Sequence, residues 1–118
     1  MGGWFSTVPQ NVSLDSEEGR LVQTILHDKT VVVFSKTTCP YCRMAKNALD
    51  EHNANYETVE LNQREDGPRI QSILGQMTGA TTVPRVFIMG KFIGGGTDIK
   101  RLNDEGKLEG MLQEAGAI

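Results

Sequence analysis

This chain of 118 residues lacks several features that define large classes of proteins. Its longest purely apolar runs hold four residues, as at 31–34, whereas a membrane-spanning helix needs about 20. No block of acidic or basic residues exceeds three, and the formal net charge is −3. A mildly acidic chain without a basic patch argues against nucleic acid as the main partner. The sequence therefore excludes a membrane-spanning protein and disfavours a nucleic-acid-binding one.

Cysteine is scarce, since only Cys39 and Cys42 are present. A secreted disulfide scaffold of this size usually carries four or more cysteines. Two cysteines three positions apart cannot staple a fold, so we interpret them as one chemical unit. A protein of this kind fits a reducing compartment, and we expect it in the cytoplasm.

The first fourteen residues carry no charged side chain. They lack the basic and apolar regions of a secretory signal and the arginines of a mitochondrial presequence. We therefore expect residues 1–14 to form a flexible N-terminal tail and residues 15–118 to form one domain. Gly2, with Ser6 in the sixth position, matches the loose pattern for N-myristoylation. An unmodified tail fits the same residues.

Hydrophobic periodicity predicts alternating helices and strands along the domain. The expected elements are a helix capped by Asp15 or Ser16, a strand at 31–35, a helix after Cys39, a strand at 56–61, a helix beginning at 67–68 and ending at Gly79, strands at 86–89 and 92–93, and closing helices from Asp98. The continuous β-branched run at 31–35 is typical of a buried parallel strand. One βαβ unit followed by a hairpin gives a four-stranded mixed sheet with helices on both faces. With Cys-x-x-Cys after the first strand, this α/β pattern predicts a thioredoxin fold.

The two cysteines lie where the first strand gives way to a helix. If Cys39 is the N-cap, Pro40 takes the first helical position, where proline is favoured. The Cys39 sulfur can then accept hydrogen bonds from the N–H groups of Tyr41 and Cys42, and the helix N-terminus favours its thiolate. Cys42 lies one turn into the helix and should be more buried. We therefore predict Cys39 as the exposed nucleophile and Cys42 as the resolving thiol.

Two other roles for these cysteines can be weighed. A structural zinc site needs four ligands, and only His27 and His52 remain, neither with suitable spacing. We therefore expect no metal. Two inert structural cysteines are the other alternative, which fits poorly with Pro40 at a junction between strand and helix.

Three motifs in register carry a family resemblance. They are Cys39-Pro40-Tyr41-Cys42, Thr82-Val83-Pro84 and Gly94-Gly95-Gly96-Thr97-Asp98. With these motifs the chain resembles the dithiol glutaredoxins over roughly residues 21–112. Segments such as Phe34-Ser35-Lys36-Thr37 and Met77-Thr78-Gly79 look most like the vertebrate glutaredoxin-two type. A true thioredoxin would normally have Trp before its first cysteine, where this chain has Thr38.

The resemblance implies a glutathione site, position by position. Val83, next to Thr82, would pair its backbone with the cysteine of glutathione, and Pro84 would be cis. Thr97 and Asp98 would hold the γ-glutamyl end, with Asp98 taking its ammonium. The remaining positions implied are Lys36 and Gln71 for the glycine carboxylate and Tyr41 as a wall of the groove. Three further cations either add positive potential near the tripeptide or are plain surface charges: Arg43, Lys46 and Arg85.

The resemblance also implies a function. We expect a monomeric, glutathione-dependent thiol–disulfide oxidoreductase that uses glutathione as co-substrate. Its partners would be glutathionylated or disulfide-containing proteins. One alternative is a dimer that binds and delivers a glutathione-ligated [2Fe–2S] cluster through Cys39. Cluster-holding relatives often have Ser at the position of Pro40, so Pro40 disfavours that role. A reductase coupled to thioredoxin reductase is another alternative.

Overall fold

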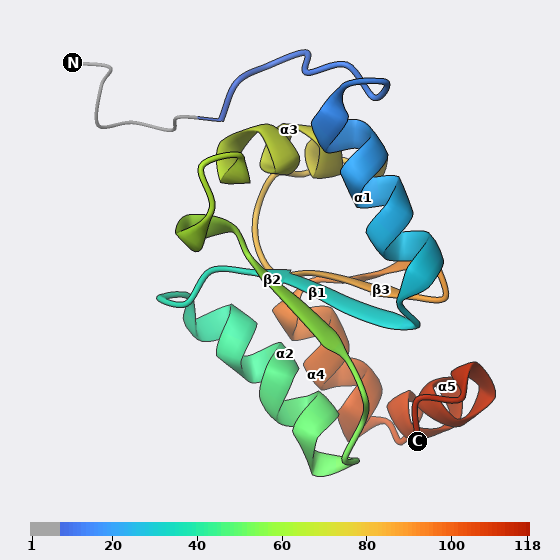
Figure 1. Cartoon of the computed structure of the whole chain (residues 1–118). Coiled ribbons are helices and arrows are strands. Elements are labelled where there is room, and N and C mark those ends of the chain that lie inside the picture. Colours follow the sequence, from blue (N-terminus) through green and yellow to red (C-terminus); the bar gives the residue numbers. More distant parts are fainter. Residues whose placement is uncertain (1–7) are drawn as a thin grey trace.

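The computed structural model describes residues 8–118 (Figure 1). Residues 1–7, with the predicted acylation site at Gly2, lie outside the described residues. The elements are α1 (Glu17–Asp28), β1 (Val31–Ser35), α2 (Pro40–Glu51), β2 (Glu57–Glu60), the 3₁₀ helix η2 (Leu61–Gln63), α3 (Gly67–Thr78), β3 (Arg85–Ile88), β4 (Lys91–Gly94), α4 (Gly96–Asp104) and α5 (Leu108–Ala115). Within residues 8–118, no helix has the length and apolar character that crossing a membrane requires.

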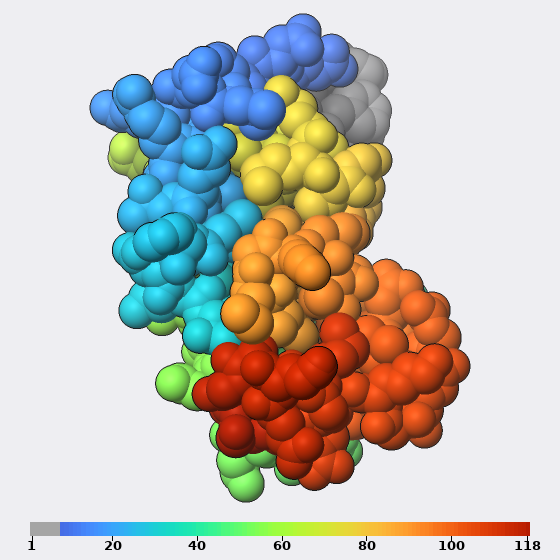
Figure 2. Space-filling model, turned by 90° about the vertical axis from the view of Figure 1, so that its right-hand side faces the viewer, coloured from blue at the N-terminus to red at the C-terminus, as the bar shows by residue number. Residues whose placement is uncertain are grey.

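The four strands form one mixed sheet in the order β2-β1-β3-β4. β1 runs parallel to β2 and antiparallel to β3, and β3 pairs antiparallel with β4 through a short hairpin. This arrangement confirms the predicted βαβ unit followed by a hairpin. Figure 2 shows the hairpin in orange between α3 in yellow and the C-terminal helices in red.

Helices cover both faces of the sheet, as predicted (Figure 1). All five residues of β1 are buried, because this central strand is covered from both sides. Val32 and Phe34 belong to the core under α1 and α3. Val31 and Val33 point the other way, into the core formed with α2, α4 and α5. This strict alternation is what a strand in the middle of three layers requires.

The helix boundaries follow local capping chemistry. Ser16 caps α1 through its hydroxyl, which accepts a hydrogen bond from the N–H of Gly19 at 3.1 Å. The helix predicted to begin at Asp98 begins two residues earlier, at Gly96. The reason is that Asp98 sits in the first turn, where its Oδ2 accepts the N–H of Gly95 at 2.9 Å. An acidic side chain in that position satisfies a donor that the helix leaves free.

The segment before α1 contacts the domain. Val12 is only 5% exposed and belongs to the core shared by α1 and α3. The side-chain amide of Gln76 donates to the carbonyl of Val12 at 2.7 Å. The predicted tail, residues 1–14, thus includes a residue that packs into the core. The domain boundary at residue 15 stays a prediction.

Candidate active site

Cys39 lies at the N-cap of α2, at the end of the loop that follows β1. Pro40 occupies the first turn, and the N–H of Cys42 donates to the Cys39 sulfur over 3.4 Å. Of the two N–H donors expected, that of Cys42 makes the bond. The Cys39 side chain is partly exposed, and the first turn of α2 holds no acidic residue. The predicted geometry is therefore present: an accessible sulfur at the positive end of a helix.

Cys42 occupies a contrasting environment, because it is fully buried. Burial raises the pKa of the Cys42 thiol, and the N–H of Lys36, which donates to its sulfur at 3.4 Å, partly opposes this effect. A raised pKa means that the protonated thiol persists to higher pH than in an exposed cysteine. Both cysteines are free in this structure. The pair therefore holds one accessible sulfur and one enclosed thiol.

This contrast predicts selective alkylation of the folded protein. At pH 7 to 8, iodoacetamide should label Cys39 and leave Cys42 unlabelled, because Cys42 is both buried and held as a thiol. Peptide mapping by mass spectrometry reads the modified position. Denaturant serves as the control and should expose both cysteines. Labelling of Cys42 at the rate of Cys39 in the native protein would contradict this assignment.

The segment before β3 lies against the reactive sulfur. The peptide bond between Val83 and Pro84 is cis, as the resemblance implied. The Cys39 thiol lies 3.6 Å from the carbonyl oxygen of Val83, to which it can donate. The backbone of Val83 thus borders the space that a substrate sulfur must enter to reach Cys39.

The glycine-rich turn brings the third motif to the same place. A Cβ atom on Gly96 would lie 2.6 Å from the carbonyl oxygen of Tyr41, so the start of α4 rests directly on the start of α2. Thr97 and Asp98 follow in the first turn of α4. Tyr41 is 54% exposed and does not pack into the core. Three motifs that are far apart in the sequence therefore meet around Cys39.

A residue that sequence analysis missed anchors the loop before Cys39. The Asn62 side chain accepts the N–H of Thr37 at 3.1 Å and donates to the Thr37 hydroxyl at 2.7 Å. Asn62 lies in η2, at the end of the neighbouring strand β2. These two bonds tie the loop that leads to Cys39 to the edge of the sheet. No sequence signal marks this pair, because 25 positions separate its members.

Gln71 and Lys36, which were expected to bind the glycine carboxylate of glutathione, lie in different surroundings. Gln71 is 8% exposed, and its side-chain amide donates to the carbonyl of Thr81 at 2.7 Å. Its visible role is to support the segment that leads to Val83. Lys36 is half-buried next to Cys42, and its side chain makes no ion pair within residues 8–118. Binding of glutathione by either residue stays a prediction.

The three additional cations have separate surroundings. Lys46 pairs with Glu60 at 2.6 Å, and the Arg85 guanidinium donates to groups within the protein. Arg43 is exposed and lines an open groove of about 720 Å³ that begins at Cys39 and runs between α2 and α4. Among residues 8–118, no group of three or more His, Cys, Asp or Glu side chains could hold a metal ion.

Comparisons with a family model, with curated proteins and with solved structures all find glutaredoxins. The family model described as glutaredoxin matches residues 31–93. Bovine glutaredoxin-2, mitochondrial, is 52% identical over 93 residues, which are 79% of this chain and 59% of the bovine protein. Oxidised glutaredoxin 2 from Chlamydomonas reinhardtii superposes with a TM-score of 0.83 at 47% identity, covering 86% of this chain and 96% of that one. A buckwheat glutaredoxin–glutathione complex superposes with a TM-score of 0.82 at 46% identity, covering 86% and 92%.

The cytoplasmic location expected from the sequence is wrong. The bovine relative and those from orangutan, human, mouse and rat all carry the name glutaredoxin-2, mitochondrial. These names point to mitochondria. The expectation rested on the small number of cysteines and on residues 1–14, which lack the arginines of a mitochondrial presequence. The chain spans about three fifths of the length of these curated relatives.

The match covers the fold and two of the three motifs. The solved relatives superpose on 86% of this chain, whose four strands form one sheet covered by helices. The matched region, residues 31–93, includes both cysteines and the cis-proline segment. The resemblance proposed from the three motifs is thus confirmed, and the chain belongs to the glutaredoxin family.

Proposed function

We propose that the protein is a glutathione-dependent thiol–disulfide oxidoreductase. It reduces protein–glutathione mixed disulfides and protein disulfides, with glutathione as co-substrate. The observation that carries this proposal is the accessible Cys39 sulfur at the N-terminus of α2, 3.6 Å from the Val83 carbonyl beside the cis-proline. The solved buckwheat relative in complex with glutathione supports the choice of co-substrate.

The reaction proceeds by two thiol–disulfide exchanges. The Cys39 thiolate attacks the glutathione sulfur of the mixed disulfide, and the protein sulfur leaves as a thiolate that takes up a proton. Cys39 is then disulfide-bonded to glutathione. The thiolate of a second glutathione attacks the glutathione sulfur of this intermediate, which releases oxidised glutathione and restores the Cys39 thiolate. The helix N-terminus stabilises Cys39 as the leaving group in this second step.

The surrounding residues orient the first glutathione. The backbone of Val83, in the segment from Thr82 to Pro84, pairs with the cysteine residue of glutathione. Thr97 and Asp98 hold its γ-glutamyl end. The remaining contacts in this proposal are Lys36 and Gln71 for the glycine carboxylate and Tyr41 as a wall of the glutathione site.

Cys42 acts in the reduction of protein disulfides. There Cys39 attacks one sulfur of the substrate disulfide and forms a mixed disulfide with the substrate protein, while the other substrate sulfur leaves as a thiolate. The Cys42 thiolate then attacks the Cys39 sulfur, so that a Cys39–Cys42 disulfide forms and the second substrate sulfur leaves as a thiolate. Two glutathione molecules reduce the Cys39–Cys42 disulfide and leave as oxidised glutathione. The helical turn that separates the two positions brings the N–H of Cys42 to within 3.4 Å of the Cys39 sulfur. The burial of Cys42 restricts its access to external disulfides and leaves Cys39 as its natural partner.

A turnover assay tests the function. The protein should release a peptide thiol from a glutathionylated peptide when glutathione is the reductant, as detected by coupled glutathione reductase and by chromatography. Thioredoxin reductase in place of glutathione should give no more than background release. Turnover with thioredoxin reductase and none with glutathione would reject the proposed reaction.

Asp98 allows a direct test of the γ-glutamyl contact. Asp98→Ala should raise the KM for the glutathionylated peptide about tenfold or more, since a hydrogen bond to a charged group contributes roughly 1.5 kcal/mol or more. Because Asp98 also accepts the N–H of Gly95, Asp98→Asn is the matched variant that keeps an acceptor and removes the charge. It should raise KM similarly, with an unchanged melting temperature. A wild-type KM in the Asn variant would limit Asp98 to capping α4.

A further inference from the structure

Arg85 makes three side-chain hydrogen bonds beside the site. It is the first residue of β3 and follows the cis-proline directly. Its Nε donates to the Pro84 carbonyl at 3.3 Å, its Nη1 to the Thr78 hydroxyl at 3.3 Å and its Nη2 to the Thr82 hydroxyl at 3.1 Å. One guanidinium therefore bonds the C-terminal end of α3 and both sides of Val83.

The other surroundings of Arg85 belong to the β3–β4 hairpin and the glycine-rich turn. The centre of its guanidinium lies 4.8 Å from the centre of the Phe92 ring, a favourable cation–π distance. The Phe92 ring in turn contacts Phe87 in the core, with 5.5 Å between the ring centres. A Cβ atom on Gly95 would lie 3.5 Å from both Nη2 of Arg85 and the Pro84 carbonyl oxygen, so the turn that leads to Asp98 passes close by.

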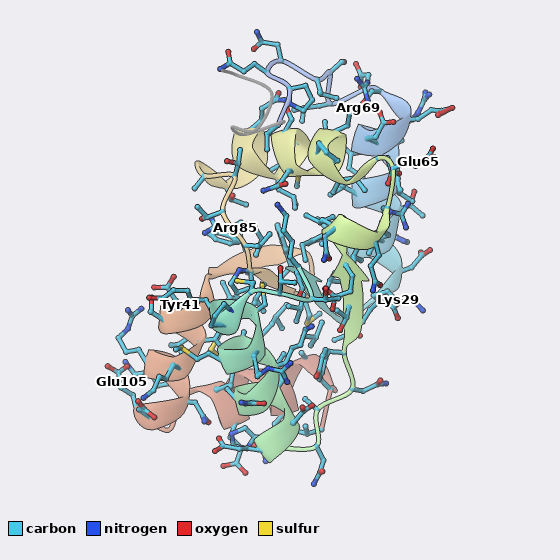
Figure 3. The ribbon with its side chains drawn as sticks, turned by 90° about the vertical axis from the view of Figure 1, so that its left-hand side faces the viewer. Lys29, Tyr41, Glu65, Arg69, Arg85 and Glu105 are labelled. Atoms are coloured by element: carbon cyan, nitrogen blue, oxygen red, sulfur yellow. The ribbon has the colours of Figure 1, made fainter. Side chains whose placement is uncertain are left out.

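These contacts place Arg85 between two parts of the proposed glutathione site. One part is the segment from Thr82 to Pro84, whose Val83 carbonyl faces Cys39. The other is the turn from Gly94 to Asp98. Figure 3 shows Arg85 between α3 and the start of α2, on the same side of the molecule as Tyr41.

We infer that Arg85 is a positioning residue for thiol–disulfide exchange: its guanidinium holds the segment from Thr82 to Pro84 at a fixed place relative to Cys39 and to the glycine-rich turn. This role rests on the proposed function. It replaces the expectation that Arg85 acts through positive potential on the anionic tripeptide. Small displacements of a binding segment reduce rates strongly, because reaction requires aligned sulfur atoms.

The two explanations predict different results for Arg85→Lys. Lysine keeps the positive charge, but its ammonium is a point charge that cannot reach three acceptors in the plane of a guanidinium. If charge alone matters, the Lys variant should behave like the wild type. If positioning matters, it should lose nearly as much as Arg85→Gln.

We expect both Arg85 variants to lower kcat/KM for a glutathionylated peptide about fivefold to tenfold, mainly through KM. The alkylation rate of Cys39 should stay within about twofold of wild type, which shows that the sulfur and the fold around it are intact. Arg69→Lys is the matched control, because Arg69 pairs with Glu18 at 3.0 Å through its Nε on another part of α3. This control should leave kcat/KM unchanged.

A double-mutant cycle with Thr78→Val tests the contact itself. Thr78 bonds Arg85 but belongs to none of the three motifs around Cys39, and valine keeps its shape. The single variant should lower kcat/KM about twofold. The part of this effect that comes from the bond with Arg85 should vanish in the Arg85→Lys background, because that bond is already lost there. The bonds from the Thr78 hydroxyl to the carbonyls of Leu74 and Ala80 are lost in both backgrounds and do not enter the coupling. This milder change remains informative if the Arg85 variants unfold, which a melting curve reveals.

The outcomes separate this inference from the proposed function. Absence of glutathione-dependent turnover in the wild-type protein would reject the proposed function. Normal wild-type turnover with an Arg85→Lys variant equal to it would overturn the positioning role alone. Independent, multiplicative effects of Thr78→Val and Arg85→Lys would also overturn it. A lower kcat at unchanged KM, in proportion to a smaller folded fraction, would reduce Arg85 to a structural role.

Discussion

Cys39→Ser should abolish the reduction of a glutathionylated peptide, with a loss of at least about a thousandfold in kcat/KM. A serine hydroxyl at this position cannot form a disulfide with glutathione and cannot act as the leaving group in the second exchange. Cys42 cannot take its place, because it is fully buried. Cys42→Ser should retain turnover within about fivefold of wild type, since both exchange steps need only one protein sulfur. The two cysteines should thus differ by more than two orders of magnitude.

Steady-state assays with peptide–glutathione mixed disulfide measure this difference. A substrate with an internal protein disulfide is the complementary test, and there both serine variants should fail because Cys42 must resolve the intermediate. Mass spectrometry after incubation with oxidised glutathione should show one tripeptide on Cys39 in the Cys42→Ser variant. An equal loss of deglutathionylation in both variants would remove the proposed mechanism.

Local sequence patterns were sufficient for the elements and for the position of the two cysteines. The buried run of β1 and the capping residue Ser16 each depend on neighbours within a few positions. The same is true of Cys39, whose place at the N-cap follows from Pro40 and the strand before it. Such short-range chemistry is visible in a single sequence, which explains why the order of elements was predicted correctly.

Contacts between distant segments could not be predicted in this way. The bonds from Asn62 to Thr37 and from Arg85 to Thr78 depend on how β2, α3 and β3 are placed around the sheet. The bond from the Gln71 amide to the Thr81 carbonyl is another contact of this kind, whereas the contact of Gln71 with glutathione stays a prediction. The sequence shows that a position carries a charge or an amide. The fold decides whether that side chain faces a ligand or supports the backbone.

Gly96 shows how the fold and the site depend on one close contact. Its missing side chain lets the start of α4 rest on the backbone of α2, because a Cβ atom would lie 2.6 Å from the Tyr41 carbonyl oxygen and 3.0 Å from the Tyr41 Cβ. The obstacle is a backbone atom at a helix start, which cannot rotate away. Gly96→Ala should therefore push α4 away from α2 and displace Thr97 and Asp98 from Cys39.

We expect Gly96→Ala to lower the free energy of unfolding by about 1 to 3 kcal/mol, the usual cost of overpacking. It should also raise the KM for glutathionylated peptide while the alkylation rate of Cys39 is kept. Gly110→Ala is the matched control, since Gly110 lies in α5 and a Cβ atom added there would meet nothing within 4 Å. That change should stabilise the protein by roughly 0.5 to 1 kcal/mol, because alanine favours the helix. Urea unfolding measures the free energy of unfolding of the two variants. Equal values would show that α4 can move without cost. The glycine-rich turn would then not fix the γ-glutamyl end of the site.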